Sequence, residues 1–146
     1  MLSVHEIYDL HNKELKENET IHVNDHFDLV LGPVGSGKVT LLRKQYSDAI
    51  FIVASDNLRE FVGYSTSNKD VQKDKILIID EITNISKYDM NFLLELTLNE
   101  EAEYNLLENL SIKPGILSQE FINKQEHCKV PLIYSKIVGV IQTRRC

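Results

Sequence analysis

The sequence predicts an α/β layered structure in which strands alternate with helices around a largely parallel sheet. Three observations predict it. Residues 49–54 and 75–80 are continuous apolar runs, which are typical of parallel strands buried on both faces. Residues 39–46 and 88–99 carry apolar side chains at helical spacing. A glycine-rich loop joins an apolar strand to the first of these helices.

The 146 residues are enough for one hydrophobic core and too few for two, so we expect a single domain over 1–146. It divides into an acidic helical segment over 1–20 and an α/β core over 21–146. The net charge of −6 argues against a general nucleic-acid coat, but it leaves room for a local basic path. Cys128 and Cys146 lack metal-ligand spacing, and the chain has no secretory leader and no long apolar run. We therefore expect a cytoplasmic protein with free thiols and no membrane partner.

In the first half of the chain, residues 1–18 predict an amphipathic helix, because apolar side chains recur among acids. Residues 21–23 predict a short strand that turns into the strand over 27–31. A helix over 39–46 and a buried strand over 49–54 follow. The scattered histidines predict exposed loop side chains rather than a metal site.

In the second half, the polar residues 65–74 predict a loop before the buried strand over 75–80. The helix over 88–99 carries Met90, Leu93, Leu94 and Leu98 on one face, and residues 100–110 continue it after a break.

Pro114-Gly115 predicts a turn, and Ser118 is a candidate cap of a short helix. Residues 130–134 and 137–142 predict a strand or a hairpin that ends at a basic tail.

The loop Gly32-Pro33-Val34-Gly35-Ser36-Gly37-Lys38 follows the pattern G-x-x-x-x-G-K between a strand and a helix. A triphosphate is densely charged, and a loop holds it by presenting many backbone N–H groups at close range. Glycines allow that approach and the backbone angles it requires. The helix N-terminus and the Lys38 ammonium add positive charge. The candidate nucleotide-binding residues are Gly32, Pro33, Val34, Gly35, Ser36, Gly37, Lys38, Val39 and Thr40.

The loop departs from its pattern at Val39, where Ser or Thr normally binds Mg²⁺ through its hydroxyl. The nearest hydroxyl belongs to Thr40, and successive helical side chains point about 100° apart, so it is no simple replacement. We expect nucleotide binding to survive this change, because amides and Lys38 do most of the holding. Metal placement, and with it the rate of hydrolysis, depends on an altered loop geometry or a water-mediated contact.

A second candidate region is Asp80-Glu81, two acids at the end of the strand over 75–80. At the carboxyl end of a parallel strand, Asp80 would lie beside the loop and hold Mg²⁺ through its water shell. Glu81 would polarise an attacking water as a general base. Asp80 and Thr40 are the candidate metal ligands, and Glu81 and Lys38 the candidate catalytic residues.

The two regions resemble the Walker A and Walker B motifs of P-loop NTPases, in the branch with a catalytic glutamate that contains AAA+ proteins, helicases and viral packaging ATPases. The resemblance implies a three-layer P-loop NTPase domain that binds ATP, or another NTP, with Mg²⁺. It also implies a strand between the loop strand and the acidic strand, ending in a polar sensor. Residues 137–142 fit that strand, with Gln142 or Thr143 as the sensor.

Residues Arg144 and Arg145 fit either an arginine finger for a neighbouring subunit or a solvated basic tail, and we favour the tail. The chain ends just past the sensor strand, without the fifth strand or the helical lid of related domains. Either the segment 21–23 covers the exposed sheet edge, or the chain is a reduced or truncated member, shortened at its C-terminal end.

Three functions remain open from the sequence. The first is an oligomeric ATPase that couples hydrolysis to work on nucleic acid or a protein partner. The second is a nucleotide-binding switch or interaction module with weak or no hydrolysis, which Val39 favours. The third, weaker one is a small nucleoside or nucleotide kinase, which lacks an arginine-rich lid.

Overall fold

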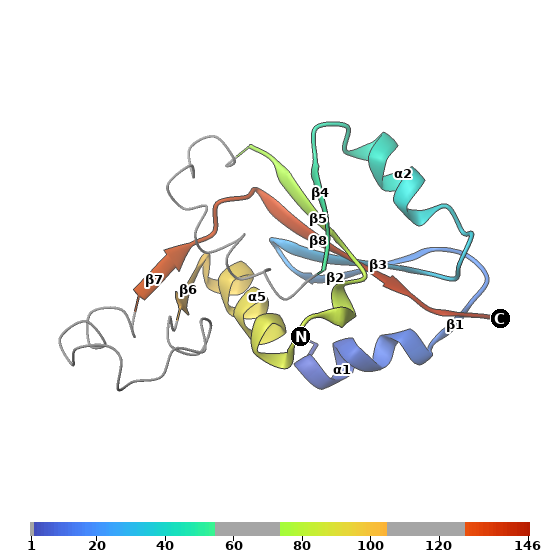
Figure 1. Cartoon of the computed structure of the whole chain (residues 1–146), viewed down its shortest axis with the longest axis horizontal. Helices are drawn as coiled ribbons and strands as arrows, with labels where there is room; N and C mark the ends of the chain where they lie inside the picture. The colour runs from blue at the N-terminus through green and yellow to red at the C-terminus, as the bar shows by residue number, and fades with distance from the viewer. Residues whose placement is uncertain (1, 55–73, 105–127) are drawn as a thin grey trace, which may run out of the picture.

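The computed structural model describes residues 2–54, 74–104 and 128–146, and it contains a mixed α/β structure (Figure 1). Its main sheet has five strands in the order β2-β3-β8-β5-β4. The last four run parallel to one another, and β2 pairs antiparallel with β3. This confirms the predicted α/β class with a mostly parallel sheet.

The elements follow one another along the chain with short connections. The helical segments are α1 (Val4–Asp9), η1 (Leu10–Asn12), α2 (Lys38–Gln45), η3 (Ile82–Asn84) and α5 (Lys87–Asn99). The strands are β1 (Glu14–Leu15), β2 (Glu19–Asn24), β3 (Phe27–Gly32), β4 (Ile50–Val53), β5 (Ile76–Asp80), β6 (Glu101–Tyr104), β7 (Cys128–Pro131), β8 (Lys136–Gln142) and β9 (Arg144–Arg145).

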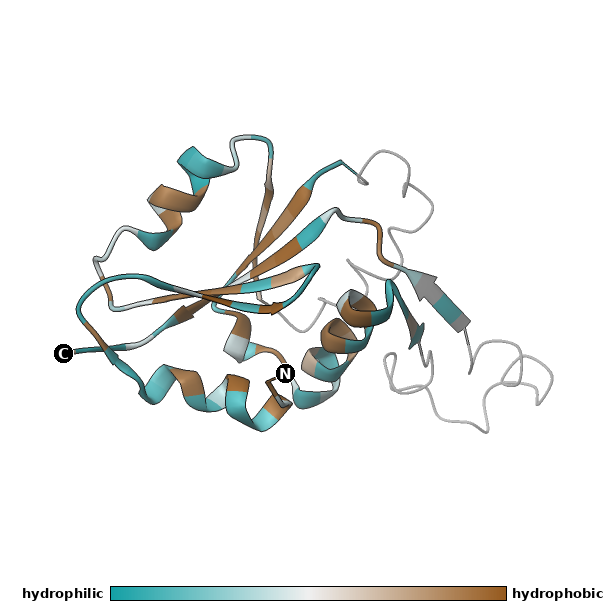
Figure 2. Ribbon diagram, turned by 180° about the vertical axis from the view of Figure 1, so that it is seen from behind, coloured by the Kyte–Doolittle hydropathy of each residue, from teal (hydrophilic) through white to brown (hydrophobic). Residues whose placement is uncertain are grey.

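The strands β3, β5 and β8 are apolar on both faces because helices cover both faces of the sheet. Leu29, Leu31 and Ile79 belong to the core cluster that α1, η3 and α5 complete on one face. Val30 and Ile78 belong to the smaller cluster that α2 covers on the other face. Figure 2 shows this apolar centre in brown. As expected for strands buried on both sides, polar residues occur mainly at their ends.

Strand β8 lies between β3 and β5, as predicted for the strand over 137–142. Its Gly139 allows a close approach, since a Cβ there would lie 2.6 Å from Ile82 Cδ1 and 2.9 Å from Leu29 Cδ2. The alternative of a hairpin between 130–134 and 137–142 is wrong. Strand β7 instead pairs antiparallel with β6, in a separate two-stranded sheet.

The predicted helix over 1–18 is too long. Ser3 caps α1 in a capping box with Glu6, and helical structure ends at Asn12. The chain then becomes extended, because Glu14–Leu15 pairs in parallel with Arg144–Arg145. The segment over 1–20 is therefore only partly helical, and β2 begins inside it at Glu19.

Strand β2 covers the edge of β3, as the first of the two alternatives for residues 21–23 predicted. At the other end of the described sheet, β4 is half-buried rather than buried, because it has a neighbour on one side only.

The helix over 88–99 is confirmed, but its continuation over 100–110 is wrong where the structure describes it. Glu100 ends α5 in the left-handed conformation (φ 61°), and this reverses the chain into β6. Thr97 is buried (1 % exposed) and donates to the Leu93 carbonyl, whereas Leu98 is 51 % exposed. The predicted loop residues 65–73, the Pro114-Gly115 turn and the Ser118 cap lie outside the described residues.

Across the described stretches, no helix combines the length and the apolar character that crossing a membrane requires.

Candidate phosphate-binding site

The loop after β3 depends on two glycines with left-handed backbone, Gly35 (φ 77°) and Gly37 (φ 75°). Ser36 N donates to the Pro33 carbonyl at 3.2 Å and closes a tight turn between them. A Cβ at Gly37 would meet no atom within 4 Å, and one at Gly35 only Arg145 Nη2 at 3.8 Å. Backbone conformation therefore selects glycine at both positions. The space beside them is open, as a phosphate cradle requires.

Gly32 is selected for a different reason, which the sequence did not indicate. A Cβ there would lie 2.1 Å from Asn18 Oδ1 and 2.7 Å from Ser36 Oγ. Asn18, from the segment between β1 and β2, also donates through Nδ2 to the Ser36 carbonyl at 3.2 Å. The room at Gly32 is thus taken by the protein itself, and Asn18 braces the loop from behind.

Helix α2 starts at Lys38 with Gly37 as its N-cap, and no side chain caps its first turn. Its first amides and its positive end therefore face the loop. Val39 packs with buried Leu42 in the core cluster under α2, whereas Thr40 is exposed. An apolar side chain at 39 is thus explained by packing. The Thr40 hydroxyl does not take its place.

Two cations contact neighbouring carbonyls of the loop. Lys38 Nζ donates to the Pro33 carbonyl at 3.3 Å. Arg145 Nη2 donates to the Val34 carbonyl. Within 2–54, 74–104 and 128–146, no carboxylate forms a salt bridge with either cation. The loop therefore carries two positive charges whose partners are neutral oxygens, an arrangement that favours a polyanion.

The structure brings the acidic strand end to the same sheet edge as the loop. Ile79 is in register with Gly139, and Gly139 with Leu29, so the three form one row across the sheet. The loop begins at Gly32, three residues beyond this row, and Asp80 is one residue beyond it. Since only β8 separates β5 from β3, the two strands are about 10 Å apart. A phosphate on the loop and a metal on Asp80 fit this spacing.

Glu81 has a backbone conformation that is uncommon outside glycine, with φ 53° and ψ 45°. Its amide donates to Asp80 Oδ1 at 2.9 Å, and its Oε2 accepts from Asn84 Nδ2 at 3.2 Å. The left-handed residue turns the chain sharply out of β5 into η3. Strain of this kind clusters at functional sites. Asn84 holds the carboxylate that sequence analysis assigned as the base.

The sensor strand ends directly beside the loop. Gln142 is in register with Gly32, and Thr143 N donates to the Gly32 carbonyl at 3.0 Å. Thr143 is 5 % exposed and directs Oγ1 to the Arg144 carbonyl, whereas Gln142 is exposed. Of the two candidate sensors, Gln142 is the one open to a ligand.

Among the residues that the structure describes, no group of three or more His, Cys, Asp or Glu side chains could hold a metal ion. A single carboxylate such as Asp80 fits Mg²⁺, which keeps several waters and binds substrate phosphates. The neighbouring histidines contact acids instead: His22 Nδ1 lies 2.9 Å from Asp28 Oδ1, and His26 Nε2 lies 3.0 Å from Glu100 Oε1. The thiol of Cys146 is free and exposed.

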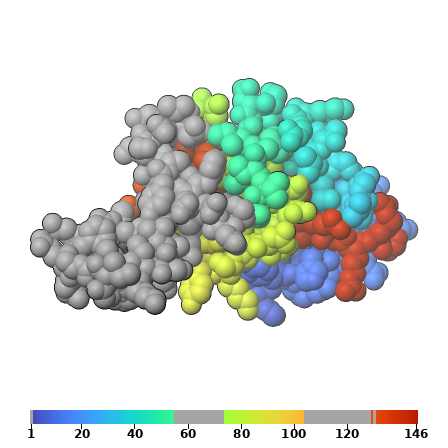
Figure 3. Space-filling model, in the orientation of Figure 1, coloured from blue at the N-terminus to red at the C-terminus, as the bar shows by residue number. Residues whose placement is uncertain are grey.

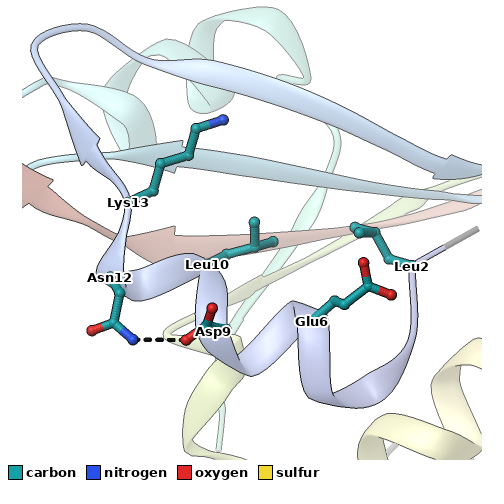
Figure 4. A pocket seen from close by; sticks show the side chains of 6 residues that line it. All are labelled: Leu2, Glu6, Asp9, Leu10, Asn12 and Lys13. Carbon is teal, nitrogen blue, oxygen red and sulfur yellow. Dashed lines mark hydrogen bonds between the residues drawn. The ribbon is translucent and has the colours of Figure 1, made fainter.

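Two hollows with described linings lie away from the loop. One, of about 410 Å³, is lined by Leu2, Glu6, Asp9, Leu10, Asn12 and Lys13, where Asn12 donates to Asp9 (Figure 4). The other, of about 220 Å³, is lined by Gln45, Tyr46, Ser47, Asp48, Ala49, Asp74, Lys75 and Ile76. Neither contains a residue assigned to the candidate site.

Sequence analysis missed three residues at this site. Asn84 follows Glu81 at the spacing of one helical turn, which could have indicated it. Asn18 carries no such signal. Arg145 was assigned to a tail or to a neighbouring subunit, but it contacts its own loop and belongs to a strand. No protein-family model matches the chain, and no curated protein matches its sequence.

Proposed function

We propose that the chain is a P-loop NTPase that binds ATP or another nucleoside triphosphate with Mg²⁺ and hydrolyses it. The observation that carries the proposal is the sheet order, in which the loop after β3 and the acids after β5 share one sheet edge with only β8 between them. Ligands of open α/β sheets bind at the carboxyl ends of the strands. The open left-handed glycines and the two unpaired cations support a polyphosphate as the ligand.

Each residue has a role in this proposal. Loop amides and Lys38 bind the phosphates, and Mg²⁺, held by Asp80 and the phosphates, neutralises charge that develops on the phosphate oxygens. Glu81 accepts the proton of the attacking water, and Asn84 orients its carboxylate. Gln142 senses the outer phosphate. Work on nucleic acid or a protein partner, within a homo-oligomer, belongs to the same proposal.

A nucleotide-binding switch with weak hydrolysis is the second candidate. The observation that favours it is the packing of Val39 in the core under α2, with Thr40 exposed. Neither side chain then offers Mg²⁺ the hydroxyl that normally follows the loop lysine. Such a chain would bind a nucleotide tightly and release phosphate slowly.

Calorimetric titration with Mg-ATP tests the binding step. Lys38→Ala removes one charge-assisted contact, and we expect ATP affinity to fall about 10- to 100-fold. Lys44→Ala is the matched control, because Lys44 is an exposed cation in the last turn of the same helix. Equal affinity in native protein and Lys38→Ala would refute the assigned site.

Phosphate release in the presence of Mg²⁺ separates the two candidates. In an ATPase, Glu81→Gln lowers turnover by a factor of about 10² to 10⁴, the usual contribution of a general base. In a switch module, native protein releases phosphate no faster than Glu81→Gln, and turnover appears only in Val39→Thr. Stimulation of turnover by single-stranded or duplex DNA would then test the nucleic-acid partner.

A further inference from the structure

The C-terminal strand β9 is fixed by the N-terminal segment of the same chain. Glu14 is in register with Arg144 and Leu15 with Arg145. Backbone bonds of 3.1 Å join Arg144 N to the Lys13 carbonyl and Cys146 N to the Leu15 carbonyl. Figure 3 shows the C-terminal residues (red) at the surface, between the N-terminal segment (blue) and the region of the loop and α2 (cyan).

The two arginines of β9 have separate partners. Arg144 Nη2 donates to Asn12 Oδ1 at 3.2 Å, at the end of η1. Arg145 Nη2 donates to the Val34 carbonyl and lies 3.8 Å from the position that a Cβ on Gly35 would take. Because successive side chains of a strand point to opposite sides, only Arg145 reaches the loop.

The contact between Arg145 and Val34 leaves most of the guanidinium unused. A guanidinium has five N–H donors, and Val34 accepts from one nitrogen. The side chain is exposed, so it is free to turn about its own torsions. Its neighbour on the loop is Lys38, a second cation on an uncharged oxygen. Both charges would gain more from phosphate oxygens than from carbonyls.

We propose that Arg145 is a second phosphate-binding cation of the loop, supplied in cis. When a triphosphate enters, the guanidinium leaves the Val34 carbonyl and binds phosphate oxygens beside the Lys38 ammonium. The planar fork of arginine suits two phosphate oxygens at once. The inference rests on the proposed function, because it assigns a further ligand-binding residue to the same site.

Mg-ATP binding by calorimetry tests the inference with three variants whose folding is checked by thermal denaturation. We expect Arg145→Ala to weaken ATP binding about 10- to 100-fold, the loss of one charge-assisted contact. Arg145→Lys keeps the charge without the fork, so it should recover part of the affinity. Arg144→Ala, the matched control on the same strand, should bind like the native chain.

The outcomes distinguish the inference from the function on which it rests. If Lys38→Ala binds ATP as well as native protein, the phosphate site itself is wrong. If Lys38→Ala weakens binding but Arg145→Ala changes it less than about fivefold, only the inference is overturned. An Arg144→Ala effect equal to that of Arg145→Ala would also overturn it.

A mixing experiment separates action in cis from action on a neighbouring subunit. Lys38→Ala protein keeps Arg145, and Arg145→Ala protein keeps an intact loop lysine. If Arg145 acts in cis, a mixture of the two hydrolyses ATP no faster than the sum of its components. Turnover restored by mixing would show that the arginine serves another chain, and would overturn the assignment.

Discussion

Replacing Glu81 by glycine should stabilise the fold while it removes turnover. Glu81 has φ 53° and ψ 45°, and this left-handed conformation costs an L-residue about 1–2 kcal/mol. Glycine avoids that cost but loses about 0.5–1 kcal/mol through its greater freedom when unfolded. Glu81→Ala keeps the strain, and both variants lose the carboxylate and the contact with Asn84. We therefore expect Glu81→Gly to be more stable than Glu81→Ala by about 0.5–1 kcal/mol.

The assay is thermal or urea denaturation of both variants, together with phosphate release. The stability difference corresponds to about 2–4 °C in Tm. Glu100 is the matched control, since it too has positive φ (61°), at the end of α5 and outside the candidate site. The Gly and Ala variants at Glu100 should differ by a similar amount and keep full turnover.

Two results would refute this reasoning. Equal stability of the Glu81 variants, alongside a clear difference between the Glu100 variants, would show that Glu81 is not held in the left-handed conformation. Turnover in Glu81→Gly above about a tenth of the native rate would exclude a general base at this position, whose loss costs at least about 10².

Three further predictions follow from the same contacts. Gly32→Ala should lower the free energy of unfolding by about 1–3 kcal/mol in urea denaturation, because the added Cβ would lie 2.1 Å from Asn18 Oδ1; the loss should shrink in a double variant with Asn18→Gly. Tyr8→Phe should cost about 1 kcal/mol at neutral pH, since the phenol donates to the Ile85 carbonyl. Burial raises the pKa of Tyr8 above 10.0, so folding favours the neutral phenol, and its contribution is lost as pH rises beyond that value; unfolding curves of native protein and Tyr8→Phe should converge there. Asn84→Ala should lower kcat but leave ATP affinity unchanged, because it orients the base without touching the nucleotide; weakened binding in calorimetry would contradict that role.

The sequence was enough to predict the order of the central strands. Continuous apolar runs mark strands buried on both faces, and helices must then cover both faces of the sheet. The glycine loop at the end of β3 and the acids at the end of β5 mark the same sheet edge. The position of β8 between these strands came from a resemblance to P-loop NTPases, and the structure agrees with it.

Short strands and chain reversals could not be predicted in the same way. Glu14–Leu15 and Arg144–Arg145 have no strand pattern of their own, and they pair only because the fold brings both ends together. The end of α5 depends on one left-handed residue, Glu100, where glycine would have given a signal. Local pattern therefore extended both helices beyond their observed ends.

The N-terminal segment contacts both halves of the candidate site, which gives it a part that its distance along the sequence conceals. Through β1 it holds Arg145 against the loop, and through Asn18 it braces the loop backbone. Through Tyr8 it hydrogen-bonds Ile85, four residues beyond the glutamate assigned as base. The loop and the acidic strand end are joined directly by β8 and a second time by this segment. A change that loosens α1 should therefore disturb both phosphate binding and the position of Glu81, although α1 contains none of the residues that would touch the nucleotide.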